Sequence, residues 1–127
     1  MGVRYNGYCS DITRTFCLRP DSKKKKISEN VSFIQQEIID SIKEGLSFDY
    51  VEKIYENLMK KNSYSVFHSF GHGVGLSPHE RPVKKDILRN GMILTVEPGV
   101  YIKNLGGYRI EDMIVIKNGK AKVISNL

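Results

Sequence analysis

The amino-acid sequence predicts an α+β fold in which helices and strands occupy separate blocks of the chain. Three observations favour this class: a hairpin pattern near the N-terminus, two stretches with helical apolar spacing, and a series of strand-like runs after Asn62. Parallel β-α-β folds instead alternate the two element types along the chain. At 127 residues, the chain has the length of one domain or of part of one.

The first element is predicted to be a β-hairpin. Asn6-Gly7, a strong turn signal, stands between residues 3–5 and the run 8–18, which is rich in β-branched and aromatic residues. Arg19 to Ser22, with Pro20 among them, are expected to end the second strand.

Two helices are expected next, because apolar residues recur at every third or fourth position. Gly45 is expected to stop the first helix, and Ser47 to cap the second. The predicted buried stripes are Ile27, Val31, Ile34, Ile38 and Ile42, and then Val51, Ile54, Tyr55 and Leu58.

The remainder of the chain is predicted to form strands. Residues 92–102 and 108–116 each resemble one strand, and Asn118-Gly119 is expected to turn the chain into a last strand over 120–124.

Composition excludes several classes of function. The net charge of +6 comes from scattered lysines and one run, 23–26, without the interleaved aromatic residues of RNA-binding modules, so no nucleic-acid partner is expected. No apolar run reaches the length of a membrane span, and no membrane partner is expected. Cys9 and Cys17 are too few for a disulfide framework, which favours a reducing, cytoplasmic location.

All three histidines fall in one glycine-rich segment, HSFGHGVGLSPHE. They are His68, His72 and His79, and the glycines between them allow the backbone to approach a ligand closely. A single histidine is more often structural, but three among glycines favour a site.

Carboxylates interrupt the apolar strands. Glu97 and Glu111 lie in strand-like runs, and Asp11 lies in SDITRTF. Each one alone is explained by a strand with a solvent-facing side, whereas a buried carboxylate requires a partner or a metal.

Together with His72, these carboxylates form a donor set without thiolates, which suits Mn, Co, Fe or Zn. Paired carboxylates can also bridge two ions. Arg109 lies two positions before Glu111, on the same face of a strand, and is expected to orient that carboxylate by a bidentate hydrogen bond.

Four segments in order, GYCSDITRTF, HSFGHGVGLSPHE, ILTVEPGVYI and GGYRIED, resemble the signature blocks of the peptidase family of Xaa-Pro aminopeptidase, prolidase and methionine aminopeptidase. The resemblance implies the pita-bread (creatinase/aminopeptidase-like) fold: a curved antiparallel sheet with helices on one face. It also implies two divalent metal ions per full-length site, with manganese the first expectation, and a metal-binding role for Asp11, His72, Glu97 and Glu111.

The resemblance further implies roles in catalysis. Glu97 would take the proton of the attacking water, His79 would stabilise the oxyanion, and His68 would position the substrate. The implied reaction is hydrolysis of the peptide bond preceding proline, on peptides with proline at the second position. Two alternatives stay open: a methionine aminopeptidase and a non-catalytic binding module.

One position of the family pattern is missing. Counting back from Asp11 by the family's spacing leads to the residue just before Met1, where a first aspartate ligand belongs. Residues 1–127 are therefore expected to be a truncated, C-terminal portion of the catalytic domain, holding at most one ion and with little or no activity alone. Exposed strand edges and apolar faces would favour a homodimer.

Overall fold

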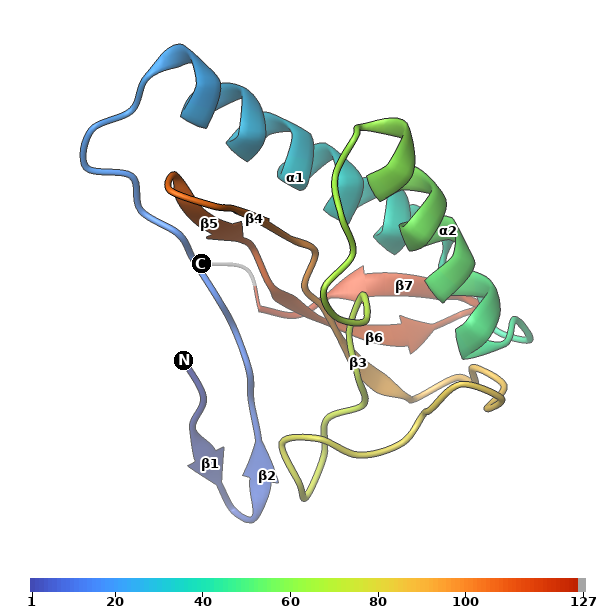
Figure 1. Ribbon diagram of the computed structural model, residues 1–127. Helices are drawn as coiled ribbons and strands as arrows, with labels where there is room; N and C mark the ends of the chain where they lie inside the picture. The colour runs from blue at the N-terminus through green and yellow to red at the C-terminus, as the bar shows by residue number, and fades with distance from the viewer. Residues whose placement is uncertain (126–127) are drawn as a thin grey trace.

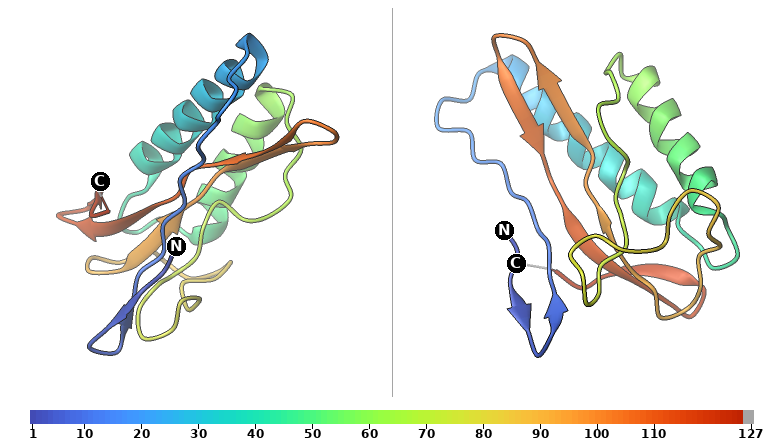
Figure 2. Two further views of the ribbon diagram at one scale, coloured as in Figure 1. Left: turned by 90° about the vertical axis from the view of Figure 1, so that its left-hand side faces the viewer. Right: turned by 60° about the horizontal axis from the view of Figure 1, so that its bottom comes forward.

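The computed structural model describes residues 1–125 and confirms the α+β class. Two helices lie side by side on one face of short antiparallel sheets, and the N-terminal hairpin and the glycine-rich loops lie on the other side (Figures 1 and 2). The helices are α1 (Ser22–Ser41) and α2 (Phe48–Lys61). Neither has the length and apolar character that a membrane crossing requires.

The strands form three small antiparallel sheets. The largest has the order β3-β6-β7, and two further sheets pair β4 with β5 and β1 with β2. Their bounds are β1 (Arg4–Tyr5), β2 (Tyr8–Cys9), β3 (Ile93–Val96), β4 (Gly99–Ile102), β5 (Gly106–Arg109), β6 (Asp112–Lys117) and β7 (Lys120–Val123).

Both long strand predictions are wrong in extent. The run 92–102 is divided between β3 and β4 at Glu97-Pro98, because proline has no N–H to continue a ladder. The run 108–116 is divided at Glu111, whose backbone pairs with Thr13 of the N-terminal segment instead of a neighbouring strand. These two interruptions free the two glutamates from the regular ladders.

The predicted strand over 8–18 is also too long. β2 ends at Cys9, and the following residues cross the sheet as an extended segment with one isolated bridge, Thr13 to Glu111. Along this segment, the N–H of Ile12 donates to the carbonyl of Met1, and Thr13 and Glu111 exchange a pair of backbone hydrogen bonds. The segment carries Asp11 to the middle of the molecule.

The helix boundaries follow local capping chemistry. Asp21 accepts a hydrogen bond from the backbone N–H of Lys24, and Ser47 caps α2 in the same way, as predicted. Gly45 does not end α1, which stops at Ser41. It instead adopts φ 90° in the connecting turn, a conformation that glycine tolerates without strain.

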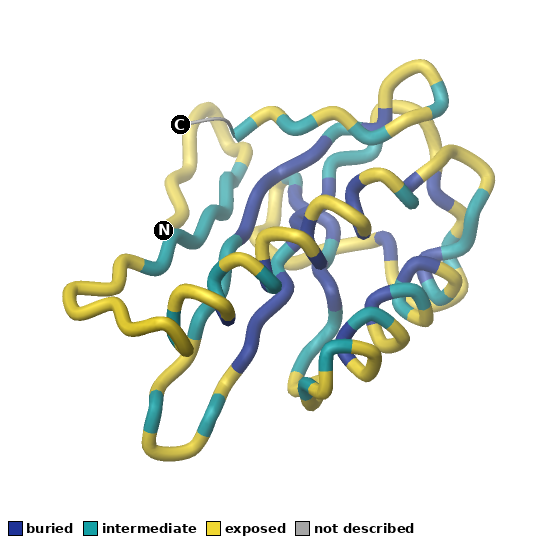
Figure 3. The backbone as a smooth tube through the Cα atoms, turned by 90° about the horizontal axis from the view of Figure 1, so that it is seen from above, coloured by how far each residue is buried: buried dark blue, intermediate teal, exposed yellow. Residues whose placement is uncertain are grey.

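The core lies between the helices and the sheets. Buried aliphatic residues of α1 belong to one core cluster with residues of the strands, and α1 contacts β3, β4, β5 and β7; the exposed surface of the helix points outward (Figure 3). Val51 and Tyr55 of α2 are fully buried as predicted, whereas Ile54 and Leu58 are half-buried. The predicted stripe of α1 is confirmed in full: Ile27, Val31, Ile34, Ile38 and Ile42 are all buried.

Candidate metal centre

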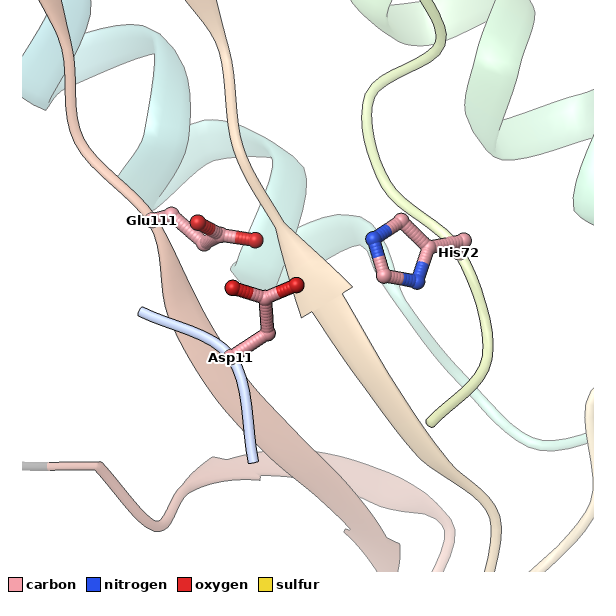
Figure 4. A group of neighbouring side chains, drawn as sticks. All are labelled: Asp11, His72 and Glu111. Atoms are coloured by element: carbon pink, nitrogen blue, oxygen red, sulfur yellow. The ribbon is translucent and has the colours of Figure 1, made fainter. Parts of the chain in front are cut away.

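Three of the predicted ligand residues converge on one point. Each of Asp11, His72 and Glu111 offers one ligand atom, and these atoms lie within 4.8 Å of one another. They come from three separate segments: the stretch after β2, the glycine-rich loop, and the junction of β5 and β6 (Figure 4). The two carboxylates approach each other and the imidazole faces them.

Glu97 adjoins this group. It follows the last residue of β3, and its Oε1 lies 3.3 Å from Nε2 of His72. The Thr95 hydroxyl accepts a hydrogen bond from the backbone N–H of His72 at 3.0 Å and donates to Oε1 of Glu97 at 3.4 Å. Thr95 therefore fixes the histidine and the glutamate relative to each other.

The glycine-rich loop reaches the site along the free edge of β3. The N–H groups of Thr95 and Glu97 donate to the carbonyls of His72 at 2.8 Å and Phe70 at 2.7 Å. A Cβ at Gly71 would lie 2.0 Å from the carbonyl oxygen of Thr95. Only glycine permits this approach, which explains its place next to the histidine.

Hydrogen bonds select the orientation of the His72 ring. Its Nδ1 lies 3.1 Å from the carbonyl oxygen of Gly73, and a carbonyl can only accept, so Nδ1 carries a proton. Nε2 is thereby directed toward the carboxylates. Such a carbonyl contact is common behind metal-binding histidines, where it fixes the tautomer.

Glu111 is held from the N-terminal segment. The residue is only 2% exposed, and its backbone forms an isolated bridge with Thr13. The Thr13 hydroxyl donates to Oε2 of Glu111 at 2.5 Å, and Nη1 of Arg14 donates to the Glu111 backbone carbonyl at 2.6 Å. The same segment thus supplies Asp11 and orients Glu111.

The electrostatics of the group are those of an anionic cluster. Burial raises the pKa of Glu111, the Thr13 hydrogen bond offsets part of that effect, and the negative charges of Glu97 and Asp11 raise the pKa further. Burial alone would lower the pKa of His72, but contact with Glu97 raises it above its usual value. Burial opposes ionisation of Glu97, yet His72 holds the pKa of this carboxyl below its usual range.

His79 and His68 occupy different places. The ring of His79 lies against that of His72, with centroids 4.0 Å apart, and is exposed to solvent. His68 lies earlier in the loop, where its Nε2 is 2.9 Å from the hydroxyl of Tyr101 and its Nδ1 is 2.9 Å from the carbonyl of Ser69.

The expected bidentate bond from Arg109 to Glu111 is wrong. Among the described residues, Arg109 makes no hydrogen bond to that carboxylate, and its Nη1 instead lies 3.9 Å from Oε2 of Glu97. The regular ladder is interrupted at Ile110 and Glu111, between β5 and β6, and the i, i+2 spacing does not bring the guanidinium to that carboxylate. The Thr13 hydroxyl fills the role that the sequence assigned to Arg109.

Several supporting residues were not predicted. Thr13 and Thr95 each stand two positions from a candidate ligand, and this i, i+2 spacing was a usable signal for a shared face. Glu52 of α2 had no such signal. Its Oε2 accepts hydrogen bonds from the Ser69 hydroxyl at 2.6 Å and the Phe70 N–H at 3.3 Å, which ties the histidine loop to α2.

The residues present fit a divalent cation. One imidazole nitrogen and carboxylate oxygens converge in a half-buried position, and gathering negative charge there is unfavourable without a positive partner. Nitrogen and oxygen donors without thiolate suit the harder and borderline divalent ions. The arrangement can therefore bind such an ion and activate water beside it.

The sequence and the fold both match known metallopeptidases. An uncharacterised peptidase of Methanocaldococcus jannaschii is 42% identical over 132 residues, 97% of this chain and 38% of that protein. A Xaa-Pro dipeptidase of Pyrococcus horikoshii is 41% identical over 131 residues, covering 97% of this chain and 37% of the relative. The chain therefore spans well under half the length of these curated relatives.

Solved structures give the same result. The prolidase of Pyrococcus horikoshii superposes with a TM-score of 0.93 at 39% identity, over 98% of this chain and 38% of that one. An X-Pro aminopeptidase of Thermotoga maritima superposes with a TM-score of 0.92 at 30% identity, over 99% of this chain and 38% of that one. The pita-bread architecture is thereby confirmed. The family model for these peptidases matches residues 1–118, and the chain belongs to metallopeptidase family M24.

Proposed function

We propose that residues 1–127 form the metal-binding portion of a peptidase that hydrolyses the bond preceding proline at peptide N-termini. The observation that carries the proposal is the convergence of Asp11, His72 and Glu111 from three distant segments of the chain. The substrate class is supported by relatives named Xaa-Pro dipeptidase at about 40% identity.

The residues that would hold the ion are Asp11, His72, Glu97 and Glu111. When bound, a divalent ion polarises the substrate carbonyl and acidifies water. Manganese is our first candidate among Mn, Co, Fe and Zn, because three of the four ligands are carboxylates, which suit the harder ions.

The chain's own groups would supply the proton transfers. Glu97, whose pKa is held below its usual value despite burial because His72 stabilises its charge, is ionised at neutral pH and can accept the proton of the attacking water. His79 is exposed beside His72 and can donate to the developing oxyanion. His68, fixed by the hydroxyl of Tyr101, would position the peptide.

The alternatives gain no support. Relatives at about 40% identity carry the name Xaa-Pro dipeptidase rather than methionine aminopeptidase. A non-catalytic module would be expected to lose the acidic and histidine ligands. In this chain the ligand positions of the family pattern that it covers carry Asp11, His72, Glu97 and Glu111. We also infer a cytoplasmic location, which the two free cysteines, Cys9 and Cys17, support.

The metal site is tested by titrating the metal-free chain with Mn²⁺ in a calorimeter. We expect no more than one tightly bound ion, because the described residues place one group of three ligand residues together. His72→Ala should abolish binding, since it removes the nitrogen donor. His68→Ala, a matched change in the same loop, should leave binding intact. Equal binding by the two variants would refute the assignment of His72.

Substrate choice is tested with the full-length enzyme loaded with Mn²⁺. Peptides with proline at the second position should be cleaved, and the same peptides with alanine there should not. Release of N-terminal methionine from peptides without proline, together with no cleavage of Xaa-Pro bonds, would place the protein with the methionine aminopeptidases instead.

A further inference from the structure

A buried amide on α1 links the two strand ends that carry the candidate glutamate ligands. Gln35 is 6% exposed, and its Nε2 donates to the backbone carbonyl of Val96 at 3.1 Å and to Oδ2 of Asp112 at 3.1 Å. Val96 directly precedes Glu97, and Asp112 directly follows Glu111. One side chain behind the sheet therefore contacts the neighbours of both glutamates.

The strand register makes this contact a bridge. Val96 of β3 and Asp112 of β6 are paired opposite each other at the end of the ladder. Beyond this pair the ladder is interrupted, at Glu97-Pro98 on one side and at Ile110-Glu111 on the other, and pairing resumes with Gly99 of β4 opposite Arg109 of β5. The amide group thus spans the last paired position before the ligands.

The chemistry of Gln35 is unusual for its location. The other buried residues of α1 are aliphatic: Ile27, Val31, Ile34, Ile38 and Ile39. A buried amide is unfavourable unless its hydrogen bonds are made, and an aliphatic side chain would pack as well. The two bonds to the strand ends offset this penalty, and they confer a directionality that packing alone lacks.

The contact continues to the third ligand segment. Oδ1 of Asp112 accepts hydrogen bonds from Nη2 of Arg14 at 2.6 Å and from the hydroxyl of Ser125 at 2.8 Å. Arg14 also donates from Nη1 to the carbonyls of Thr13 and Glu111. A chain of hydrogen bonds therefore runs from α1 through Asp112 to the segment that carries Asp11.

We propose that Gln35 is a positioning residue that sets the separation of Glu97 and Glu111, and through Arg14 the place of Asp11. The inference rests on the proposed metal site, since it assigns a role toward that same ion. Gln35 touches neither the ion nor the substrate; it acts on the backbone beside the ligands, in the manner of groups that orient metal ligands from behind.

The test is Co²⁺ binding by the metal-free chain, followed by visible absorption, which reports the geometry of the ligands. Gln35→Met keeps the length of the side chain and removes both donors. Gln35→Glu keeps its shape and sets a carboxylate against Asp112. The matched control is Gln36→Met on the same helix, because Gln36 is exposed and its side-chain amide donates to Oδ1 of Asp40, at 2.9 Å, on the outer face of α1.

Both Gln35 variants should bind Co²⁺ about ten- to a hundredfold more weakly, with a changed absorption spectrum. Gln36→Met should match the unmodified chain. Ile38→Val, a core change on the same face of α1, should lower the urea midpoint while leaving the spectrum unchanged, which separates positioning from general stability.

Asp112→Asn changes the acceptor of the Gln35 hydrogen bond instead of the donor. It tests the same inference if a Gln35 variant does not fold. Unchanged Co²⁺ affinity and spectrum in the folded Gln35 or Asp112 variants would overturn the proposal while leaving the metal site standing. No Co²⁺ or Mn²⁺ binding by the unmodified chain would instead refute the proposed function, and this inference with it.

Discussion

Single atoms decide the geometry of the histidine loop. A Cβ at Gly71 would meet the backbone carbonyl of Thr95, which β3 holds in place, whereas a Cβ at Gly75 would meet only the carboxylate of the exposed Glu80. Both glycines avoid a collision, but only the collision at Gly71 involves backbone. The two positions therefore differ in how easily the surroundings can yield.

Gly71→Ala should consequently move the loop away from β3. We expect a loss of about 1–3 kcal/mol in the free energy of unfolding, typical of overpacking, and weaker Mn²⁺ binding because His72 moves with the loop. Urea unfolding and calorimetry measure the two effects. Gly75→Ala serves as the control and should lose clearly less free energy of unfolding and less Mn²⁺ affinity. Equal losses in the two variants would show that β3 does not constrain the loop.

At this scale, the sequence predicted the candidate ligand residues better than it predicted the hydrogen bonds that support them. Residue types and their settings made Asp11, His72, Glu97 and Glu111 a possible donor set, and the resemblance to the metallopeptidases selected them as ligand candidates. The support of Glu111 by Thr13 was not foreseen, since these residues are 98 positions apart and meet only in the folded chain. Arg109 was misassigned because its spacing to Glu111 does not reveal that the guanidinium lies toward Glu97 in the folded chain.

Elements were predictable where the signal is local. The apolar spacing of α1 and the cap of α2 by Ser47 need only a few neighbouring residues, and both predictions are confirmed. Strand lengths were overestimated because alternation cannot indicate where a ladder partner ends. Pro98 was the one visible signal of the break after β3.

The cap of α1 predicts a pH dependence. The backbone N–H of Lys24 donates to the Asp21 carboxylate, and this bond, together with the Lys24 side chain, holds the pKa of Asp21 below its usual value. A depressed pKa contributes stability above the unfolded value, near pH 4, and that contribution is lost as pH falls through the folded value.

Asp21→Asn retains a capping oxygen without the titration. The unmodified chain should therefore lose more stability than the variant between pH 5 and pH 2, with the two converging at the acid end. Urea unfolding at several pH values, followed by helical circular dichroism, measures the difference. Parallel pH profiles for the two proteins would exclude a charged cap.

At the scale of the molecule, several apolar side chains along the N-terminal segment are exposed. Tyr5 is 77% exposed, Phe16 is 85% exposed and Leu18 is 95% exposed. Val3 and Tyr8 are exposed as well, and β1 pairs with β2 alone within the part of the chain that the structure describes. Exposed apolar groups beside an open strand edge promote association.

We therefore expect this chain to form a homodimer at micromolar to millimolar concentration. Val3→Glu with Tyr5→Glu should shift it to the monomer, because charges oppose burial of that surface. Phe33→Glu, at an exposed site on α1, is the matched control and should leave the mass unchanged. Light scattering over a dilution series gives the answer, and a monomer at every concentration would contradict the expectation.

The long separation of Asp11 from Glu111 also governs when the centre can exist. Closing so distant a contact requires nearly the whole chain, so it forms late in folding and only after local elements are in place. During synthesis, Asp11 must wait for Glu111, which emerges about 100 residues later. An ion held by the proposed site would therefore be bound only after β6 has been made, and it would link two segments that are far apart in the sequence.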